Sequence, residues 1–288
     1  MSQENRSRWM LIASMTIFGT IGLFVRNVPI PSGEMALCRA VMAALILGGY
    51  LLATGQSFRI SRIKSQLPLL ILSGLALGIN WILLFEAYRY TTVSTATLSY
   101  YFAPVIVTLL SPLLFREKLS GKQLLCFTAS TLGLVMITGV EANAGGSSMK
   151  GICFGLGAAV FYACVILLNK RIGQIQAIHR TFFQFLAAVL TLIPYVLASG
   201  GFHLDTLDGT GWSNLLIVGT VHTGLAYCLY FSSLAALPGQ KAAILSYIDP
   251  LVAVLVSVSL LGEPLGFWQI LGGGLILGFT LLNEISEK

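Results

Sequence analysis

Long apolar runs occupy nearly the whole chain, and they leave few folds open to it. The 288 residues are 56% apolar and only 10% charged, whereas soluble domains carry about 25% charged residues. A helix needs roughly 20 apolar residues to cross the hydrocarbon core of a bilayer, about 30 Å thick. Ten runs of that kind can be marked, with short loops between them. We therefore expect an all-α integral membrane protein with ten transmembrane helices, because a soluble chain of this size could not bury so much apolar surface.

The boundaries of the ten runs follow from where polar residues interrupt the apolar pattern. The predicted spans are Trp9–Val25, Glu34–Ala53, Leu67–Tyr88, Val93–Phe115, Lys122–Val140, Gly151–Asn169, His179–Ser199, Trp212–Leu234, Ala242–Gly262 and Pro264–Asn283.

The fourth span and the loop after it return in the ninth span, 146 residues later and without a gap. Over 94–125 and 240–271, ten of thirty-two positions are identical. The identical positions include Tyr101 with Tyr247, Pro104 with Pro250, Glu117 with Glu263, and Leu119 with Leu265. The sequence thus predicts two five-helix repeats, residues 1–145 and 146–288. Because five is odd, the second repeat enters the membrane inverted, an arrangement typical of transporters that work by alternating access.

Lysine and arginine residues are distributed unevenly between alternate loops. If the N-terminus is cytoplasmic, the inner segments hold thirteen of these residues and the outer segments hold three, while Arg39 lies within a span. Positive residues collect on the cytoplasmic side of membrane proteins. We therefore expect a multi-pass protein of the plasma (cytoplasmic) membrane with both termini cytoplasmic. The net charge of +6 is scattered between apolar runs, so no nucleic-acid partner is predicted.

The ending of each half carries a Tyr-x-x-Pro … Glu-x-Leu pattern, and Asn80 and Arg39 stand ahead of the first copy. With ten spans and an inverted repeat, this chain resembles the EamA family of the drug/metabolite transporter superfamily over essentially its whole length. The resemblance implies a secondary active or facilitative transporter of small organic metabolites, such as amino acids or related compounds, with export favoured. It also implies a cavity lined mainly by the first, third, fourth, sixth, eighth and ninth spans.

Polar and aromatic residues near the middle of the spans are the candidates for substrate binding. A helix rises about 1.5 Å per residue, which brings several such residues close to the midplane. The candidates are Thr20, Asn80, Trp81, Tyr101, Phe161, Tyr162, His222, Tyr227, Tyr247 and Asp249. Aromatic rings can hold an apolar or cationic group, and the polar side chains can hydrogen-bond a polar one. The alternative, that these residues only pack against neighbouring helices, stays open.

Ionisable residues inside the spans constrain function more strongly, because placing charge in hydrocarbon is costly. Asp249 is too deep to reach the interface, and its repeat counterpart Ala103 shows that the duplicated scaffold does not require an acid. It is suited to bind a substrate ammonium group or to carry a coupled proton; a purely structural role is the alternative. We expect Arg39 to extend toward the interface, either in a structural contact or with a substrate carboxylate. His222 suits proton coupling or a neutral, hydrogen-bonded role.

Three further features are read as structural. Pro104 and Pro250 should kink their spans and are candidate hinges. Glu117 and Glu263 should cap or anchor neighbouring helix ends. The glycines of the tenth span, among them Gly272, should allow close helix packing.

Two rival functions are a membrane enzyme and a channel-like facilitator. The chain has no G-x-S-x-G or H-E-x-x-H motif and no Walker motif, so we expect neither catalysis nor ATP-driven transport. The five cysteines are odd in number and lack metal-ligand spacing, and no cofactor or metal is predicted. The expected partners are a small-molecule substrate and the lipid bilayer. Substrate identity, direction, proton coupling and oligomeric state stay open, with a monomer as one of the options.

Overall fold

The computed structural model describes residues 3–55, 60–115, 120–144, 146–172, 175–234, 237, 242 and 245–286, and its regular elements there are helices. The first half contains α1 (Gln3–Gly19), α2 (Ile21–Val25), α3 (Ser32–Ala53), α4 (Ile60–Tyr90), α5 (Val93–Tyr100), α6 (Ala103–Phe115) and α7 (Gly121–Ala144). The second contains α8 (Gly146–Arg171), α9 (Ala177–Ala198), η1 (Leu204–Thr206), α10 (Gly209–Gly219), η2 (Thr220–Leu225), α11 (Ala226–Leu234), α13 (Ile248–Ser259) and α14 (Phe267–Ser286).

The outer surface of the bundle is apolar. Among the described residues, seven helical stretches are long and apolar enough to cross a membrane, and three shorter apolar helices accompany them. Large apolar side chains point outward, with Leu52 80% exposed and Leu113 78% exposed. A soluble monomer rarely exposes so much apolar surface, so these faces suit lipid. The all-helical membrane class is confirmed, whereas the count of ten crossings stays a prediction.

Several predicted spans are interrupted helices. The first breaks at Thr20 between α1 and α2, and the fourth breaks at Tyr101 and Phe102 between α5 and α6. In the ninth, α13 begins only after Tyr247. The sequence bounds did not include these breaks, because the broken turns depend on packing that hydropathy does not report.

The proline positions differ correspondingly from the prediction. Pro104 is the second residue of α6, and Pro250 is the third residue of α13. In the first turn of a helix an N–H has no intrahelical acceptor, so proline loses no hydrogen bond there. The prolines thus follow the breaks and do not kink the middle of a helix, and their role as hinges stays a prediction.

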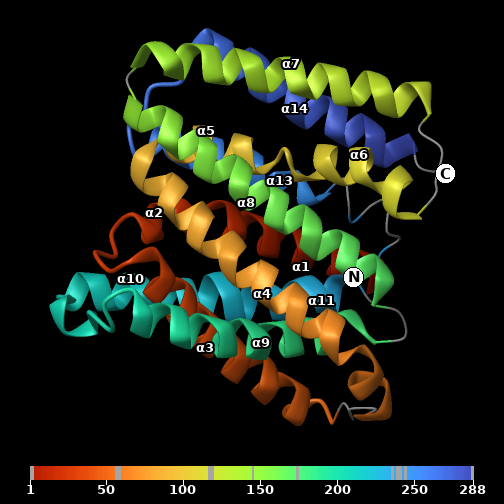
Figure 1. Ribbon diagram of the computed structural model, residues 1–288, viewed down its shortest axis with the longest axis vertical. Helices are drawn as coiled ribbons and strands as arrows, with labels where there is room; N and C mark the ends of the chain where they lie inside the picture. Colours follow the sequence, from red (N-terminus) through yellow and green to blue (C-terminus); the bar gives the residue numbers. More distant parts are fainter. Residues whose placement is uncertain are drawn as a thin grey trace.

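The helices pack in pairs that join the two halves of the chain. α7 lies beside α14 at one edge of the bundle (Figure 1), and α3 lies against α9. α4 packs on α8, while α1 packs on α11. Gly133 and Gly272 allow α7 and α14 to approach closely, since a Cβ atom at Gly133 would lie 2.5 Å from the carbonyl oxygen of Gly272. By contrast, a Cβ atom at Gly274 or Gly278 would have no neighbour within 4 Å. The predicted close helix packing is therefore found at only some of the glycines of the tenth span.

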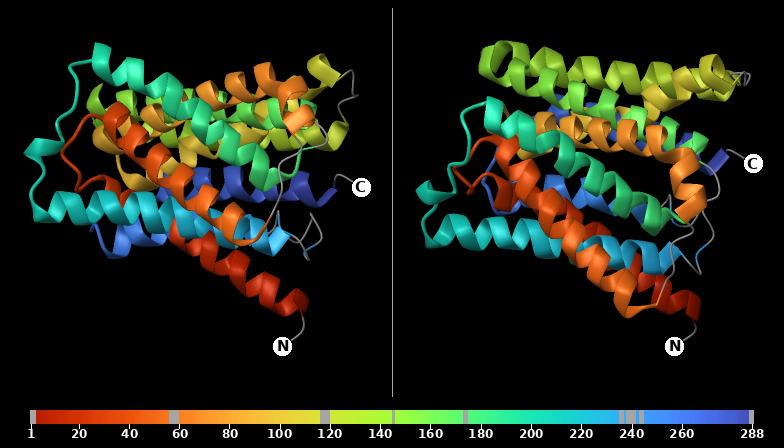
Figure 2. Two further views of the ribbon diagram at one scale, coloured as in Figure 1. Left: turned by 90° about the horizontal axis from the view of Figure 1, so that it is seen from below. Right: turned by 60° about the horizontal axis from the view of Figure 1, so that its bottom comes forward.

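The two chain ends lie toward the same end of the bundle (Figure 2). α3 and α9 both close with a glycine in the left-handed region, Gly55 at φ 64° and Gly200 at φ 119°. Glycine adopts this conformation without the steric cost that other residues incur.

Candidate functional site

A cavity of about 340 Å³ lies between the helices of the two halves. Seven of the chain's ten tyrosines line it, together with two charged residues, Arg39 and Asp249. The tyrosines are Tyr88, Tyr100, Tyr101, Tyr162, Tyr227, Tyr230 and Tyr247. α7 and α14 contribute none of its lining residues, in keeping with a peripheral position, whereas α3 contributes Arg39 in addition to the expected spans.

The structure brings most of the predicted site residues together at this cavity. Its wall includes Arg39, Asn80, Trp81, Tyr101, Pro104, Tyr162, Tyr227, Tyr247 and Asp249. Three predicted substrate-binding residues do not line it: Thr20, Phe161 and His222. Their predicted depth was compatible with a midplane site, but depth along a helix says nothing about which face of the helix a residue occupies. The candidate hinge Pro250 does not line it either.

Other lining residues were missed by the sequence reasoning. They are Met15, Phe18, Ile21, Leu77, Leu84, Tyr88, Thr97, Tyr100, Ala103, Ile166, Tyr230 and Ser246. Helical spacing was a usable signal for part of this set, because residues three or four apart share a face. Leu77, Leu84 and Tyr88 lie on the same face of α4 as Asn80 and Trp81.

Arg39 lies inside the bundle, only 4% exposed. Its Nε donates to Thr223 Oγ1 at 2.7 Å, and its guanidinium carbon lies 4.5 Å from the ring centroid of Trp81. The expectation that Arg39 extends to the interface was wrong, since these two partners stabilise the charge within the protein. Among the described residues none accepts a hydrogen bond from its two terminal amino groups, and those donors can serve a ligand.

A π-helical turn holds the partner of Arg39 in place. In η2 the hydroxyl of Thr223 donates to the carbonyl oxygen of Val218, five residues earlier, at 2.9 Å. Single π-helical turns inside longer helices are frequent at functional sites. The hydroxyl oxygen of Thr223 is thereby oriented to accept from Arg39.

Asp249 occupies the first turn of α13 and accepts a hydrogen bond from the Tyr101 hydroxyl at 2.7 Å. The partial positive charge at a helix N-terminus favours a carboxylate there. No ion pair joins Asp249 to Arg39 among the described residues. The cavity therefore presents one acidic and one basic group that are each open to a ligand.

Only one of the two polar atoms of the Asn80 side-chain amide has a hydrogen-bond partner among the described residues. Its Nδ2 donates to the carbonyl oxygen of Ala158 at 2.7 Å, which fixes the orientation of the group. Its Oδ1 has no hydrogen-bond partner in the described part of the chain, and the residue is only 1% exposed. A buried amide oxygen is costly to leave unpaired, so this atom is suited to accept from an N–H or O–H group that enters the cavity.

His222 lies behind the cavity wall. Its Nε2 is 2.9 Å from Thr20 Oγ1, its Nδ1 is 3.3 Å from the carbonyl oxygen of Ile217, and its ring centroid is 4.8 Å from that of Phe24. These contacts match the hydrogen-bonded, structural alternative for this histidine. They join the break between α1 and α2 to the π-helical turn η2.

Comparison with known proteins finds relatives that are named as transporters. The sequence profile of the EamA-like transporter family matches residues 6–139 and again residues 149–284. The uncharacterized transporter YxxF of Bacillus subtilis is 33% identical over 288 residues, covering 99% of this chain and 92% of that protein. A probable amino-acid metabolite efflux pump of Salmonella typhimurium is 27% identical, covering 86% and 87%. A crystal structure with a TM-score of 0.66, 16% identity and 97% coverage of both chains shares the fold. The chain belongs to the EamA-like transporter family and is a multi-pass membrane transporter of the drug/metabolite type.

Proposed function

We propose that the protein is a secondary active or facilitative carrier that moves small zwitterionic metabolites, amino acids or related compounds, by alternating access. The observation that carries this proposal is a tyrosine-lined cavity whose two charged residues, Arg39 and Asp249, do not pair with each other. Opposite charges attract strongly in a low-dielectric site. Because Arg39 and Asp249 are not paired with each other, each can attract an opposite charge on a ligand. A ligand with a carboxylate and an ammonium group would satisfy both.

Arg39 and Asp249 are each suited to bind one charged end of such a ligand. The terminal amino groups of Arg39 match a carboxylate, which a guanidinium can bind in a bidentate manner. Asp249 can bind the ammonium group or carry a coupled proton. Asn80 Oδ1 adds an acceptor, and the tyrosine rings suit an apolar or aromatic side chain. At about 340 Å³, the cavity is at the small end of ligand pockets, which run from about 300 to 1,000 Å³.

Two inverted five-helix repeats, 1–145 and 146–288, are the proposed basis of alternating access. The family profile matches each half separately. Tyr101 and Tyr247, which align in the repeat, both stand at helix breaks and both line the cavity. Ten crossings would return the chain to the side where it began, in agreement with the position of its ends (Figure 2).

The orientation and the direction of transport are also part of the proposal. The bias of lysine and arginine favours cytoplasmic termini in the plasma membrane. The Salmonella relative is named as an efflux pump for amino-acid metabolites, which favours export of a similar substrate class here.

Counterflow in liposomes tests this function. Purified protein would be assayed with isotopically labelled phenylalanine, leucine and threonine, and with phenylethylamine and phenylpropionate as analogues that lack one charged group. We expect saturable counterflow for at least one amino acid and much weaker competition by both analogues. Unsaturable flux would indicate a channel, and chemical conversion of the compound would indicate an enzyme; either result would overturn the proposal.

A further inference from the structure

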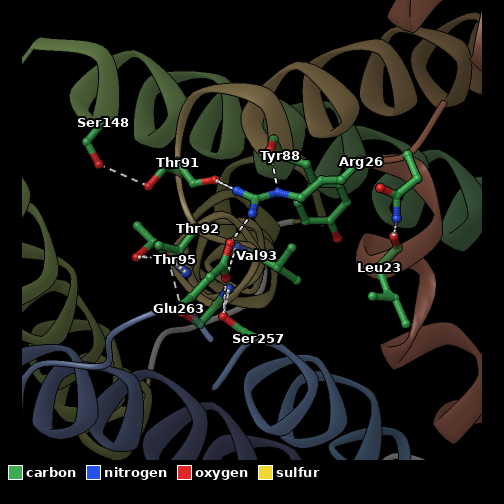
Figure 3. A network of polar contacts seen from close by, with 12 residues as sticks. Leu23, Arg26, Tyr88, Thr91, Thr92, Val93, Thr95, Ser148, Ser257 and Glu263 are labelled. Carbon is green, nitrogen blue, oxygen red and sulfur yellow. Dashed lines mark hydrogen bonds and ion pairs between the residues drawn. The ribbon is translucent and has the colours of Figure 1, made fainter. Parts of the chain in front are cut away.

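An ion pair joins Arg26 and Glu263 (Figure 3), at the end of the bundle that the proposed orientation places outside. Arg26 directly follows α2 in the first half of the chain, and Glu263 lies between α13 and α14 in the second half. Glu263 is only 8% exposed, so solvent screens this pair less than a surface pair. The contact joins the two halves directly.

Arg26 also binds the end of α4. Its Nε donates to the carbonyl oxygen of Tyr88 at 2.9 Å, and its second amino group donates to the carbonyl oxygen of Thr91. The last carbonyls of a helix have no intrahelical donor, and a cation is favourable there. Arg26 thus ties the first span to the third.

Glu263 binds the start of α5. One carboxylate oxygen accepts from the backbone N–H of Val93 at 2.8 Å and from the hydroxyl of Ser257, while the other meets Arg26. This contact confirms the prediction that Glu263 anchors a neighbouring helix end. Its sequence counterpart, Glu117, lies outside the described residues.

The network lies directly next to the cavity. Tyr88 belongs to both, because its side chain lines the cavity while its carbonyl oxygen accepts from Arg26. Below the ion pair the helices are in close contact: a Cβ atom at Gly22 would lie 2.6 Å from Val93 Cγ1. At this level α2 and α5 therefore lie against each other without room for a larger residue at position 22.

We propose that Arg26 and Glu263 form an outer latch, which holds the cavity closed on that side and must break each time the protein opens outward. The inference rests on the proposed alternating access, because rocking one half against the other would separate the two residues. The latch would stabilise the state in which the cavity is reached from the cytoplasm.

Cysteine labelling tests the latch without any substrate. Two reporters in a background free of native cysteines would be Leu84→Cys, on the cavity wall of α4 near Tyr88, and Ser246→Cys, on the wall contributed by the ninth span. A membrane-impermeant maleimide would be applied to intact cells for the first reporter and to inside-out vesicles for the second. The latch variants are Arg26→Gln and Glu263→Gln, of which the second keeps an oxygen for Val93 N–H.

We expect each latch variant to raise outer labelling of Leu84→Cys by about tenfold, a shift equivalent to about 1.4 kcal/mol. Inner labelling of Ser246→Cys should fall, because opening outward closes the inner side. The matched control is Arg89→Gln, which removes a charge from the same end of α4. Arg89 pairs with Glu86 at 3.4 Å and donates to the carbonyl oxygen of Ile30 at 3.2 Å, so these contacts stay within the first half of the chain. This control should leave both labelling rates unchanged.

Three results would overturn the latch: unchanged labelling in both variants, increased labelling of both reporters, which indicates a loosened bundle, or the same effect from Arg89→Gln. The outcome is separable from the proposed function. If outer labelling rises and inner labelling falls but no amino acid shows counterflow, the latch is supported and the proposed substrate class is refuted. If amino acids show counterflow but labelling is unchanged, the substrate class is supported and the latch is refuted.

Discussion

Replacing Asp249 by asparagine removes one negative charge from the cavity and changes little else. The side chain keeps its size, and its amide oxygen can still accept from the Tyr101 hydroxyl, which now lies 2.7 Å from the carboxylate. Insertion and folding should therefore be preserved. What is lost is a charge-assisted contact to a substrate ammonium group, worth about 1.5–3 kcal/mol. At about 1.4 kcal/mol per tenfold, the affinity for an amino acid should fall by about 10- to 140-fold.

The assay is counterflow and binding competition in liposomes at matched protein density. Tyr101→Phe is the matched control, because it removes the hydroxyl next to Asp249 and leaves the carboxylate in the cavity. It should weaken amino-acid binding much less than Asp249→Asn does. Binding of phenylpropionate, which has no ammonium group, should be the same in the wild type and in Asp249→Asn.

Proton coupling gives the same variant a second readout. If Asp249 carries the coupled proton, Asp249→Asn should lose the pH dependence of transport while retaining exchange of substrate across the membrane. A wild-type affinity combined with a wild-type pH profile would refute both roles and leave Asp249 as part of the scaffold.

Three further predictions concern other parts of the molecule. In a cysteine-free background, Ser61→Cys should react only from the cytoplasm and Asp205→Cys only from outside; labelling of both from outside would contradict the ten-crossing orientation. Trp81→Leu should weaken amino-acid affinity by about 2- to 30-fold, because it removes a cation–π contact to Arg39 worth about 0.5–2 kcal/mol, and unchanged competition would return Trp81 to packing alone. Gly272→Leu should destabilise the α7–α14 contact by about 1–3 kcal/mol and lower the melting temperature in detergent, whereas Gly274→Leu, with no neighbour within 4 Å, should not.

The sequence alone was sufficient for the membrane class, the duplication and the transporter family. Apolar run length and residue spacing are properties of the chain taken in one dimension, and the bilayer converts them directly into spans. Depth along the predicted spans identified Asn80, Trp81, Tyr101 and Asp249 as candidates, and all four line the cavity.

Only the tertiary structure decided how these residues are used. Hydropathy does not report where a helix breaks, so the turns at Tyr101 and Tyr247 could not be located from it. It also could not show that Arg39 turns inward, because its partner Thr223 lies 184 residues away. Arg26 and Glu263 are 237 residues apart and acquire a joint role only when the halves pack together. Such contacts depend on distances between helices, and no pattern within a single helix contains them.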